Sequence, residues 1–286
     1  MTIPARFKYP KYDSGNVPRS PYACDTHTHT LASRHAYSTL GECVEAAKAA
    51  GLELLGSTDH YSAMLHPDSP NQEQILRDYA YFINFELWPR EWDGITVLRG
   101  VEADIVDLQG HLYGWDIPLT QSITGHMLDR QRTLKDRIWD DIDYAIASIH
   151  NHDWANDATL AQTTSMYVRA LEDPKVLILG HPGRAGVPFD LDTVLVAAKE
   201  LGKLIEINEH SFGSSFRGQS SETCRRIAER CAELGTMVAT GTDAHIATAV
   251  GHFSALPAML EEIHFPPELI ATRTREGFLD VLERHA

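Results

Sequence analysis

The sequence predicts an α/β fold built on a parallel sheet that closes, or nearly closes, into a barrel. Three observations predict it. Short apolar runs alternate with amphipathic segments along most of the chain, seven runs read as strands, and polar side chains gather where these runs end. A chain of 286 residues suffices for one such barrel, and it can bury a substantial core without disulfides or a structural metal.

The apolar runs give the expected strands, which are Tyr22–Thr26, Leu52–Thr58, Thr96–Glu102, Tyr144–Ile149, Val176–Gly180, Lys203–Asn208 and Met237–Gly241. Helical periodicity between them predicts helices at Leu40–Ala50, Gln72–Trp88, Ala158–Leu171, Leu191–Leu201 and Ser221–Leu234. Gly51, Gly202 and Gly235 stand where a glycine ends a helix. Periodicity does not separate a barrel from an open doubly wound sheet, so both remain open at this point.

The chain divides into an arm and one domain. Residues 1–20 lack periodicity and are expected to form an extended arm, followed by a single domain over 21–286. An insertion at about 106–141 interrupts the alternation of strands and helices. We expect a turn or hairpin at Val106–Ile117 and a charged helix at Ser122–Asp141 within it. That charged helix is either a solvated face or a lid or oligomer contact.

Composition limits the partners. The 25 Lys and Arg residues are outnumbered by 40 Asp and Glu, giving a formal charge of −15, so tight nucleic-acid binding is not expected. The four cysteines form no CxxC pair, and we find neither a signal-like segment nor an apolar run that could span a membrane. We therefore predict a cytoplasmic protein that acts on a small substrate.

Metal-binding residue types gather at the strand ends. The first strand runs into Asp25-Thr-His27-Thr-His29, and side chains at i and i+2 of a strand face the same side. Other strand ends supply His, Asp or Glu at the edge where barrel active sites lie, namely Asp59, His60, Glu102, His150, His181, Asp243 and His245. This common edge favours the barrel over the open sheet.

The ligand types indicate which metals fit. Histidine combined with carboxylate favours zinc, manganese or iron over magnesium or calcium. The candidates outnumber the ligands of one tetrahedral ion, so more than one divalent ion is expected. His35, six residues after His29, is a further candidate ligand near the same edge.

These residues resemble the PHP (polymerase and histidinol phosphatase) family, and in particular its YcdX-type phosphatase branch. The resemblance is carried by THTLASRHAYSTLGE (28–42), WPREWDGITVLRGVEA (88–103), GHPG (180–183), IEINEHSF (205–212) and GTDAH (241–245) with GHF (251–253). It covers nearly the whole chain except the arm and the insertion. It implies a distorted (βα)7 barrel with a trinuclear site at the carboxyl ends of the strands.

The resemblance also implies three ligand sets. One ion would take His27, His29, Glu102 and Asp243, a second Glu102, His150 and His181, and a third His35, His60 and His245. Such a site implies hydrolysis of a phosphate ester by a metal-activated hydroxide. Arg184 and Arg217 are candidate phosphate clamps, because a guanidinium fork matches phosphate geometry. Asp59 is either an orienter of a ligand histidine or a catalytic acid.

The sequence therefore predicts a phosphatase of small phosphomonoesters, such as histidinol phosphate-like, sugar or nucleotide phosphates. A phosphodiesterase or exonuclease is the first alternative, since the family also contains polymerase-associated domains. A non-catalytic protein that binds metal or a phospho-ligand is the second. The physiological substrate, the native metal and the oligomeric state are not determined by the sequence.

Overall fold

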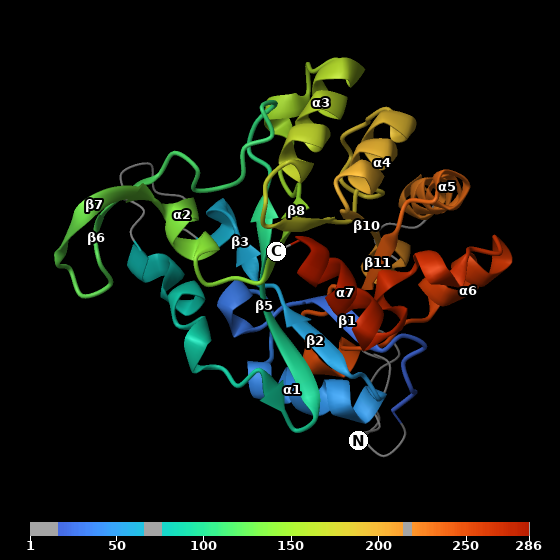
Figure 1. The fold of residues 1–286 in the computed structure, drawn as a ribbon, viewed down its shortest axis with the longest axis horizontal. Coiled ribbons are helices and arrows are strands. Elements are labelled where there is room, and N and C mark those ends of the chain that lie inside the picture. The colour runs from blue at the N-terminus through green and yellow to red at the C-terminus, as the bar shows by residue number, and fades with distance from the viewer. Residues whose placement is uncertain (1–16, 66–75, 214–218, 286) are drawn as a thin grey trace, which may run out of the picture.

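Seven parallel strands form the centre of the computed structural model, which describes residues 17–65, 76–213 and 219–285. They follow one another in the order β1 (Cys24–Thr28), β2 (Leu54–Ser57), β5 (Ile95–Asp104), β8 (Tyr144–Ser148), β9 (Val176–Leu179), β10 (Leu204–Asn208) and β11 (Val238–Gly241) (Figure 1). The two edges of this sheet meet, because Thr28 bridges Ala244 in parallel and the His29 N–H donates to Ala244 O at 2.9 Å. The sheet is a nearly closed barrel, as predicted.

Helices surround the barrel and largely follow the prediction. Four of them, α1 (Leu40–Ala50), α3 (Leu160–Leu171), α4 (Leu191–Glu200) and α5 (Gln219–Leu234), match the expected segments closely. The three glycines after α1, α4 and α5 have φ between 68° and 77°, which confirms them as left-handed helix ends. We predicted no helix after β11, where the structure adds α6 (Ala255–Glu262) and α7 (Arg275–His285).

Short elements complete the chain. Two-residue strands β3 (His60–Tyr61) and β4 (Glu91–Trp92) pair with β5. The 3₁₀ turns are η2 (Leu31–Ser33), η3 (Ala63–Leu65), η4 (Leu76–Ile83), η5 (Phe85–Leu87), η6 (Asp153–Ala155), η7 (Glu209–Phe212), η8 (Ala247–Ala249), η9 (Pro267–Leu269) and η10 (Ala271–Arg273).

The helix expected at 72–88 is wrong over its described part. Residues 72–75 lie outside the described residues, and η4 and η5 occupy most of the remainder as 3₁₀ turns separated at Asn84. Tyr79, Phe82 and Phe85 are fully buried and three residues apart. A spacing of three matches the three residues per turn of a 3₁₀ helix, and the backbone breaks at Tyr79 and Asn84 divide the segment into short turns instead of one α-helix.

The charged helix expected at Ser122–Asp141 is also wrong over most of its length. The segment holds a hairpin of β6 (Pro118–Gln121) and β7 (Met127–Thr133), and only α2 (Leu134–Trp139) is helical. Gly125 has φ 84° in the hairpin turn, and Thr133 caps α2 through a reciprocal capping box with Asp136. The tight turn expected at Val106–Ile117 is present, closed by an Ile105–Leu112 bridge. The hairpin projects from the barrel (Figure 1).

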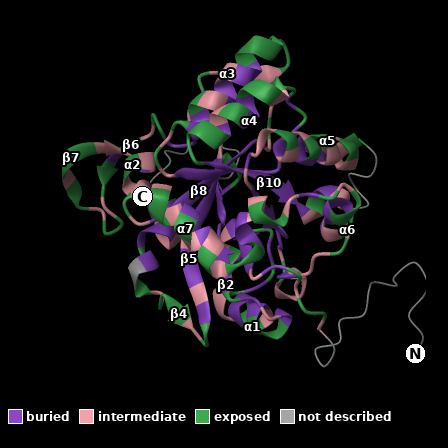
Figure 2. Cartoon of the chain, turned by 45° about the vertical axis from the view of Figure 1, so that its right-hand side comes forward, coloured by how far each residue is buried: buried purple, intermediate pink, exposed green. Residues whose placement is uncertain are grey.

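The core lies between the strands and the inner faces of the helices (Figure 2). Tyr144 of β8 shows how tightly the barrel interior is filled. Its hydroxyl donates to Thr26 O at 2.6 Å. A Cβ added at Gly56 would lie 2.0 Å from the Tyr144 hydroxyl oxygen. A side chain at position 56 therefore has no room.

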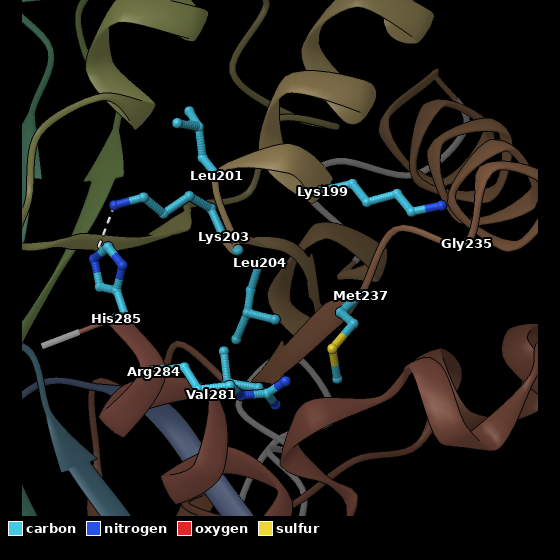
Figure 3. Close-up of a pocket in the computed structure, with 10 residues that line it drawn as sticks. Lys199, Leu201, Lys203, Leu204, Gly235, Met237, Val281, Arg284 and His285 are labelled. Atoms are coloured by element: carbon cyan, nitrogen blue, oxygen red, sulfur yellow. Dashed lines mark hydrogen bonds between the residues drawn. The ribbon is translucent and has the colours of Figure 1, made fainter.

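A cavity of about 260 Å³ lies where β10 and β11 begin, at the amino-terminal end of the barrel (Figure 3). Lys203 donates there to Val176 O at 2.6 Å and contacts His285 Nε2 at 2.8 Å, which holds α7 against the barrel. Lys199 donates to Leu234 O at the end of α5. Both lysine side chains satisfy backbone carbonyls, and Lys199 also lies at the negative end of α5.

Little of the expected arm is described. Residues 1–16 lie outside the described residues, and 17–20 carry no regular structure. The Ser20 N–H donates to Ala50 O at 2.8 Å, so the arm joins the domain beside the end of α1. Among the described residues, no helix combines the length and the apolar composition needed to cross a bilayer.

Candidate metal centre

All nine predicted metal ligands lie at the carboxyl ends of the barrel strands or in the loops that follow. The set is His27, His29 and His35 from β1 and its loop, His60 from β3, Glu102 from β5, His150 and His181 after β8 and β9, and Asp243 and His245 after β11. The parallel order of the strands brings these ends to one edge. The nine side chains therefore form one cluster at this edge.

Glu102 is the centre of the cluster and is fully buried. Its two carboxylate oxygens lie within 3.5 Å of ring nitrogens of five histidines, at 2.7 Å for His60 and His181, 3.3 Å for His27, 3.4 Å for His150 and 3.5 Å for His29. A buried carboxylate surrounded in this way can bridge two cations.

Asp243 forms a second focus beside Glu102. Its Oδ1 atom lies 3.1 Å from His29 Nε2 and 3.7 Å from His27 Nε2, while its Oδ2 atom accepts from the Arg184 guanidinium. Asp243 has φ 56°, and the neighbouring His181 has φ 28°. Non-glycine residues rarely adopt such backbone angles, and where they do the strain often marks a functional site.

Hydrogen bonds at Nδ1 fix the protonation of several rings. His27 Nδ1 lies 2.7 Å from Glu206 Oε1, and His150 Nδ1 lies 2.5 Å from Asp104 Oδ1. An ionised carboxylate only accepts, so each Nδ1 carries a proton. His245 Nδ1 donates in the same way to the carbonyl of Asp243 at 2.9 Å. The Nε2 lone pairs of these rings are thereby left for a metal.

Ser33 fixes His29 through a short chain of hydrogen bonds. The Ser33 hydroxyl donates its one proton to Asp59 Oδ1 at 2.7 Å, so its oxygen accepts from His29 Nδ1 at 3.0 Å and from the His60 N–H at 3.1 Å. Asp59 also accepts from the Thr30 N–H and hydroxyl, at 2.7 and 2.8 Å. Both Asp59 oxygens are thus engaged in holding the β1 loop.

Several buried ring and carboxylate atoms of the site make no hydrogen bond of normal geometry. Among them are His27 Nε2 and His29 Nε2, which face Glu102 and Asp243, and the pair His60 Nδ1 and Glu102 Oε2, which lie 2.7 Å apart. Leaving a buried polar atom unpaired costs about 1–3 kcal/mol, so a cluster of them calls for a ligand. Imidazole and carboxylate atoms together fit a divalent transition-metal ion.

Glu102 and His181 have the ionisation states that a cation needs. Burial raises the pKa of Glu102, but His150, His27 and His60 outweigh it and hold that pKa well below its ordinary value. Burial, followed by the charge of Arg184, lowers the pKa of His181 to about 4. The carboxylate is therefore ionised and this histidine neutral at pH 7, the forms in which both bind metals.

The pKa values of two other rings are raised instead. Burial lowers the pKa of His27, but Glu206 and Glu102 outweigh it and raise that pKa well above its ordinary value. At His150, Glu102 likewise outweighs burial and raises the pKa to about 10. A cation would therefore have to displace a proton from each of these two rings.

Three groups of three ligand atoms each lie close enough to hold one ion. They are His27 with His29 and Asp243, His60 with Glu102 and His150, and His29 with His60 and His245. His35 lies beside the last of these groups, because its Nε2 atom is 3.0 Å from His245 Nε2. His29 and His60 each belong to two of these groups.

The predicted catalytic residues differ in position. Arg184 lies in the cluster, where it donates to Asp243 and to Asn208 Oδ1. Asp59 is buried beneath the β1 loop with the partners given above. Arg217 lies outside the described residues.

Two carboxylates of the site were missed in the sequence. Glu206 lies inside β10, where it accepts from His27 and from the His181 N–H at 2.7 Å. Asp104 lies two residues after Glu102 on β5 and holds His150. A signal for each was available in the sequence. Glu206 is an acidic residue inside a predicted apolar strand, and Asp104 follows Glu102 by two residues, a spacing that places both side chains on the same face of a strand.

The chain belongs to the PHP domain family, whose model matches residues 25–212. A protein of Caldanaerobacter subterraneus named a probable phosphatase is 39% identical over 246 residues, covering 86% of this chain and 85% of its own length. A probable phosphatase of Clostridium acetobutylicum is 35% identical over 262 residues, covering 92% and 95%.

Solved structures resemble the fold. Histidinol phosphate phosphatase of Lactococcus lactis, solved with zinc, L-histidinol and phosphate, superposes with a TM-score of 0.52 and 18% identity, covering 86% of this chain and 95% of its own. A protein of Listeria monocytogenes gives a TM-score of 0.54 with 14% identity, covering 80% and 97%. At these identities the likeness concerns the fold.

Proposed function

We propose that this protein is a metal-dependent phosphatase that hydrolyses small phosphomonoesters. The observation that carries the proposal is the buried cluster around Glu102, in which five histidine rings lie within 3.5 Å of one carboxylate and the Nε2 atoms of His27 and His29 have no hydrogen-bond partner. The names of the relatives in Caldanaerobacter and Clostridium support a phosphatase. Histidinol phosphate-like, sugar and nucleotide phosphates are the candidate substrates.

We assign two to three ions of zinc, manganese or iron to the cluster. The proposed ligand sets are His27, His29, Glu102 and Asp243 for the first, Glu102, His150 and His181 for the second, and His35, His60 and His245 for the third. The close groups described above agree with these sets in part, because they contain His27, His29 and Asp243 of the first set, Glu102 and His150 of the second, and His60 and His245 of the third. Divalent ions held there would supply Lewis acidity and lower the pKa of water to near neutrality.

The chain's own residues have separable roles. Arg184 would neutralise a phosphate oxygen, since its guanidinium already lies against Asp243 at the centre. We assign Asp59 a positioning role, because it holds His29 through Ser33 and has both oxygens engaged. The proposed part of Arg217 as a second clamp stays a prediction.

The alternatives are a nuclease and a non-catalytic binding protein. A formal charge of −15 opposes a nucleic-acid substrate, whose phosphates the surface would repel. The buried strain and fixed tautomers at the centre favour chemistry over simple storage of metal. We also propose a cytoplasmic location, because all four cysteines are unpaired buried thiols.

Elemental analysis together with a phosphomonoester panel tests the proposal. Protein purified without added metal or chelator is expected to hold two to three equivalents of zinc, manganese or iron and to hydrolyse p-nitrophenyl phosphate. His27→Ala should abolish turnover, whereas His126→Ala, an exposed histidine of the β6–β7 turn, should not. One equivalent or less, without turnover after reconstitution, would refute the trinuclear assignment and favour the binding protein. Faster cleavage of single-stranded DNA than of any monoester would favour the nuclease.

A further inference from the structure

A second cavity opens beside the metal centre. It measures about 600 Å³ and lies between the loop from β9 to α4 and the first turns of α5. Arg184 belongs to both places, because it lines this cavity while its guanidinium donates to Asp243 and Asn208. A substrate whose phosphate meets Arg184 would therefore extend its alcohol half into this cavity. Cavities of this size suit small organic ligands.

The polar lining of the cavity comes from one face of α5. Gln219, Thr223 and Arg226 line it at helical spacing. None of its described lining residues is acidic, in a chain with 40 Asp and Glu. The cavity therefore carries the opposite charge to the molecule as a whole.

Arg226 differs from the other arginines of α5. Arg225 lies 2.5 Å from Glu262, and Arg230 lies 2.6 Å from Asp192. Arg226 is exposed at the mouth of the cavity that it lines, and among the described residues it makes no hydrogen bond or ion pair. A guanidinium fork without a protein partner matches a carboxylate or phosphate of a ligand.

The remaining lining is apolar. Val187, Phe189 and Ile227 face the cavity together with Pro188. An apolar wall together with two arginines suits a carbon skeleton that carries two negative groups.

We propose that the substrate is a phosphomonoester whose alcohol half carries a second anionic group, a carboxylate or a phosphate, that Arg226 binds. This inference rests on the proposed phosphatase function and narrows its substrate class. The proposed substrate differs in charge from the alcohol bound in the Lactococcus structure, which is histidinol and carries an amine. An ammonium group would be repelled by Arg184 and Arg226.

Four aryl phosphates that differ only in the para substituent test the proposal on the zinc-loaded protein. They are 4-methylphenyl, 4-(carboxymethyl)phenyl, 4-(phosphonomethyl)phenyl and 4-(aminomethyl)phenyl phosphate. We expect the carboxymethyl or phosphonomethyl compound to exceed the methyl compound about tenfold in kcat/KM, the order of one charge-assisted hydrogen bond. The aminomethyl compound should be the poorest substrate, and the better anionic arm identifies which group the site takes.

Arg226→Gln should remove this preference by raising KM for the anionic compounds while kcat stays unchanged, because the contact lies away from the reacting phosphate. Arg225→Gln, at the next position but paired with Glu262, is the matched control and should keep the preference. Equal kcat/KM for all four compounds, a preference for the aminomethyl compound, or an unchanged preference in Arg226→Gln would each overturn the inference.

Thermal protection by the same four compounds separates this inference from the proposed function. If none is hydrolysed, the phosphatase proposal fails. Greater protection by the anionic compounds, lost in Arg226→Gln and kept in Arg225→Gln, would then still support an anion-binding cavity. Equal protection by all four compounds would overturn it.

Discussion

Glu206→Gln is the substitution that best tests how the metal centre is held. The Glu206 carboxylate accepts from His27 Nδ1 at 2.7 Å, from the His181 N–H at 2.7 Å and from Asn208 Nδ2 at 3.0 Å. A glutamine amide offers one oxygen and one NH₂ group. One of the two sides of the site must therefore lose its acceptor.

Each orientation of the new amide harms the centre. With its oxygen toward His27, the NH₂ group faces the His181 N–H, and a buried donor is left unpaired at a cost of about 1–3 kcal/mol. With its NH₂ toward His27, the ring must move its proton to Nε2, and the lone pair that faces Glu102 is lost. Removing such an outer partner of a ligand histidine typically weakens metal affinity about 10- to 100-fold, or about 1.4–2.7 kcal/mol.

Competition with a chelating dye for zinc measures this affinity. Glu209→Gln is the matched control, because Glu209 lies three residues further on and accepts from Ser254 and from the N–H groups of Ala255 and Leu256 at the start of α6. We expect Glu209→Gln to lower the unfolding midpoint and leave zinc affinity unchanged. Zinc affinity of Glu206→Gln within twofold of the wild type would refute the reasoning, since His27 would then not depend on its carboxylate.

Three further perturbations have defined outcomes. Removing metal with a chelator should lower Tm by about 10 °C, because a ligand at about 1,000 times its Kd adds about 4 kcal/mol to stability, and added zinc should restore it in calorimetry. Gly56→Ala should cost about 3 kcal/mol in urea unfolding, because its Cβ would lie 2.0 Å from Tyr144 Oη, and Gly56→Ala with Tyr144→Phe should cost less than the two single changes summed. Burial lowers the pKa of Lys203 to about 8, so in the native state the amine loses its proton before the unfolded chain does. Below about pH 8 the native state carries the cost of a buried charge, and this cost is released toward pH 10.5. Because Lys203 is buried, the unfolding free energy of the wild type relative to Lys203→Met should rise over that window by up to about 3 kcal/mol. A flat difference would contradict this prediction.

The barrel and the position of the metal-binding edge followed from the sequence. Strands such as Val176–Leu179 are buried on both faces, so their residues form continuous apolar runs that stand out between amphipathic helices. Parallel strands deliver their carboxyl ends to one edge, so His27, Glu102 and Asp243 were expected together although they are far apart in the chain. Local pattern and the direction of the strands were sufficient for this part.

Segments whose local pattern competes with tertiary packing were not predicted correctly. The charged residues of Met127–Thr133 suit a solvated helix, yet the turn at Gly125 and the burial of Leu119 fix a hairpin. The aromatic residues of Leu76–Ile83 took a 3₁₀ conformation because the core accepts a spacing of three. In both segments the surroundings outweigh intrinsic helix preference.

Periodicity and side-chain chemistry were enough to predict the fold class, the edge that carries the site and the residue types that can bind metal. Which nitrogen of a ring faces the centre depends on contacts between remote segments, through partners such as Glu206, Ser33 and Asp104. The tertiary structure also decided that Arg226 lines a cavity while Arg225 is paired. These features depend on distances of a few ångströms between segments remote in the chain, and no pattern within one segment encodes such distances.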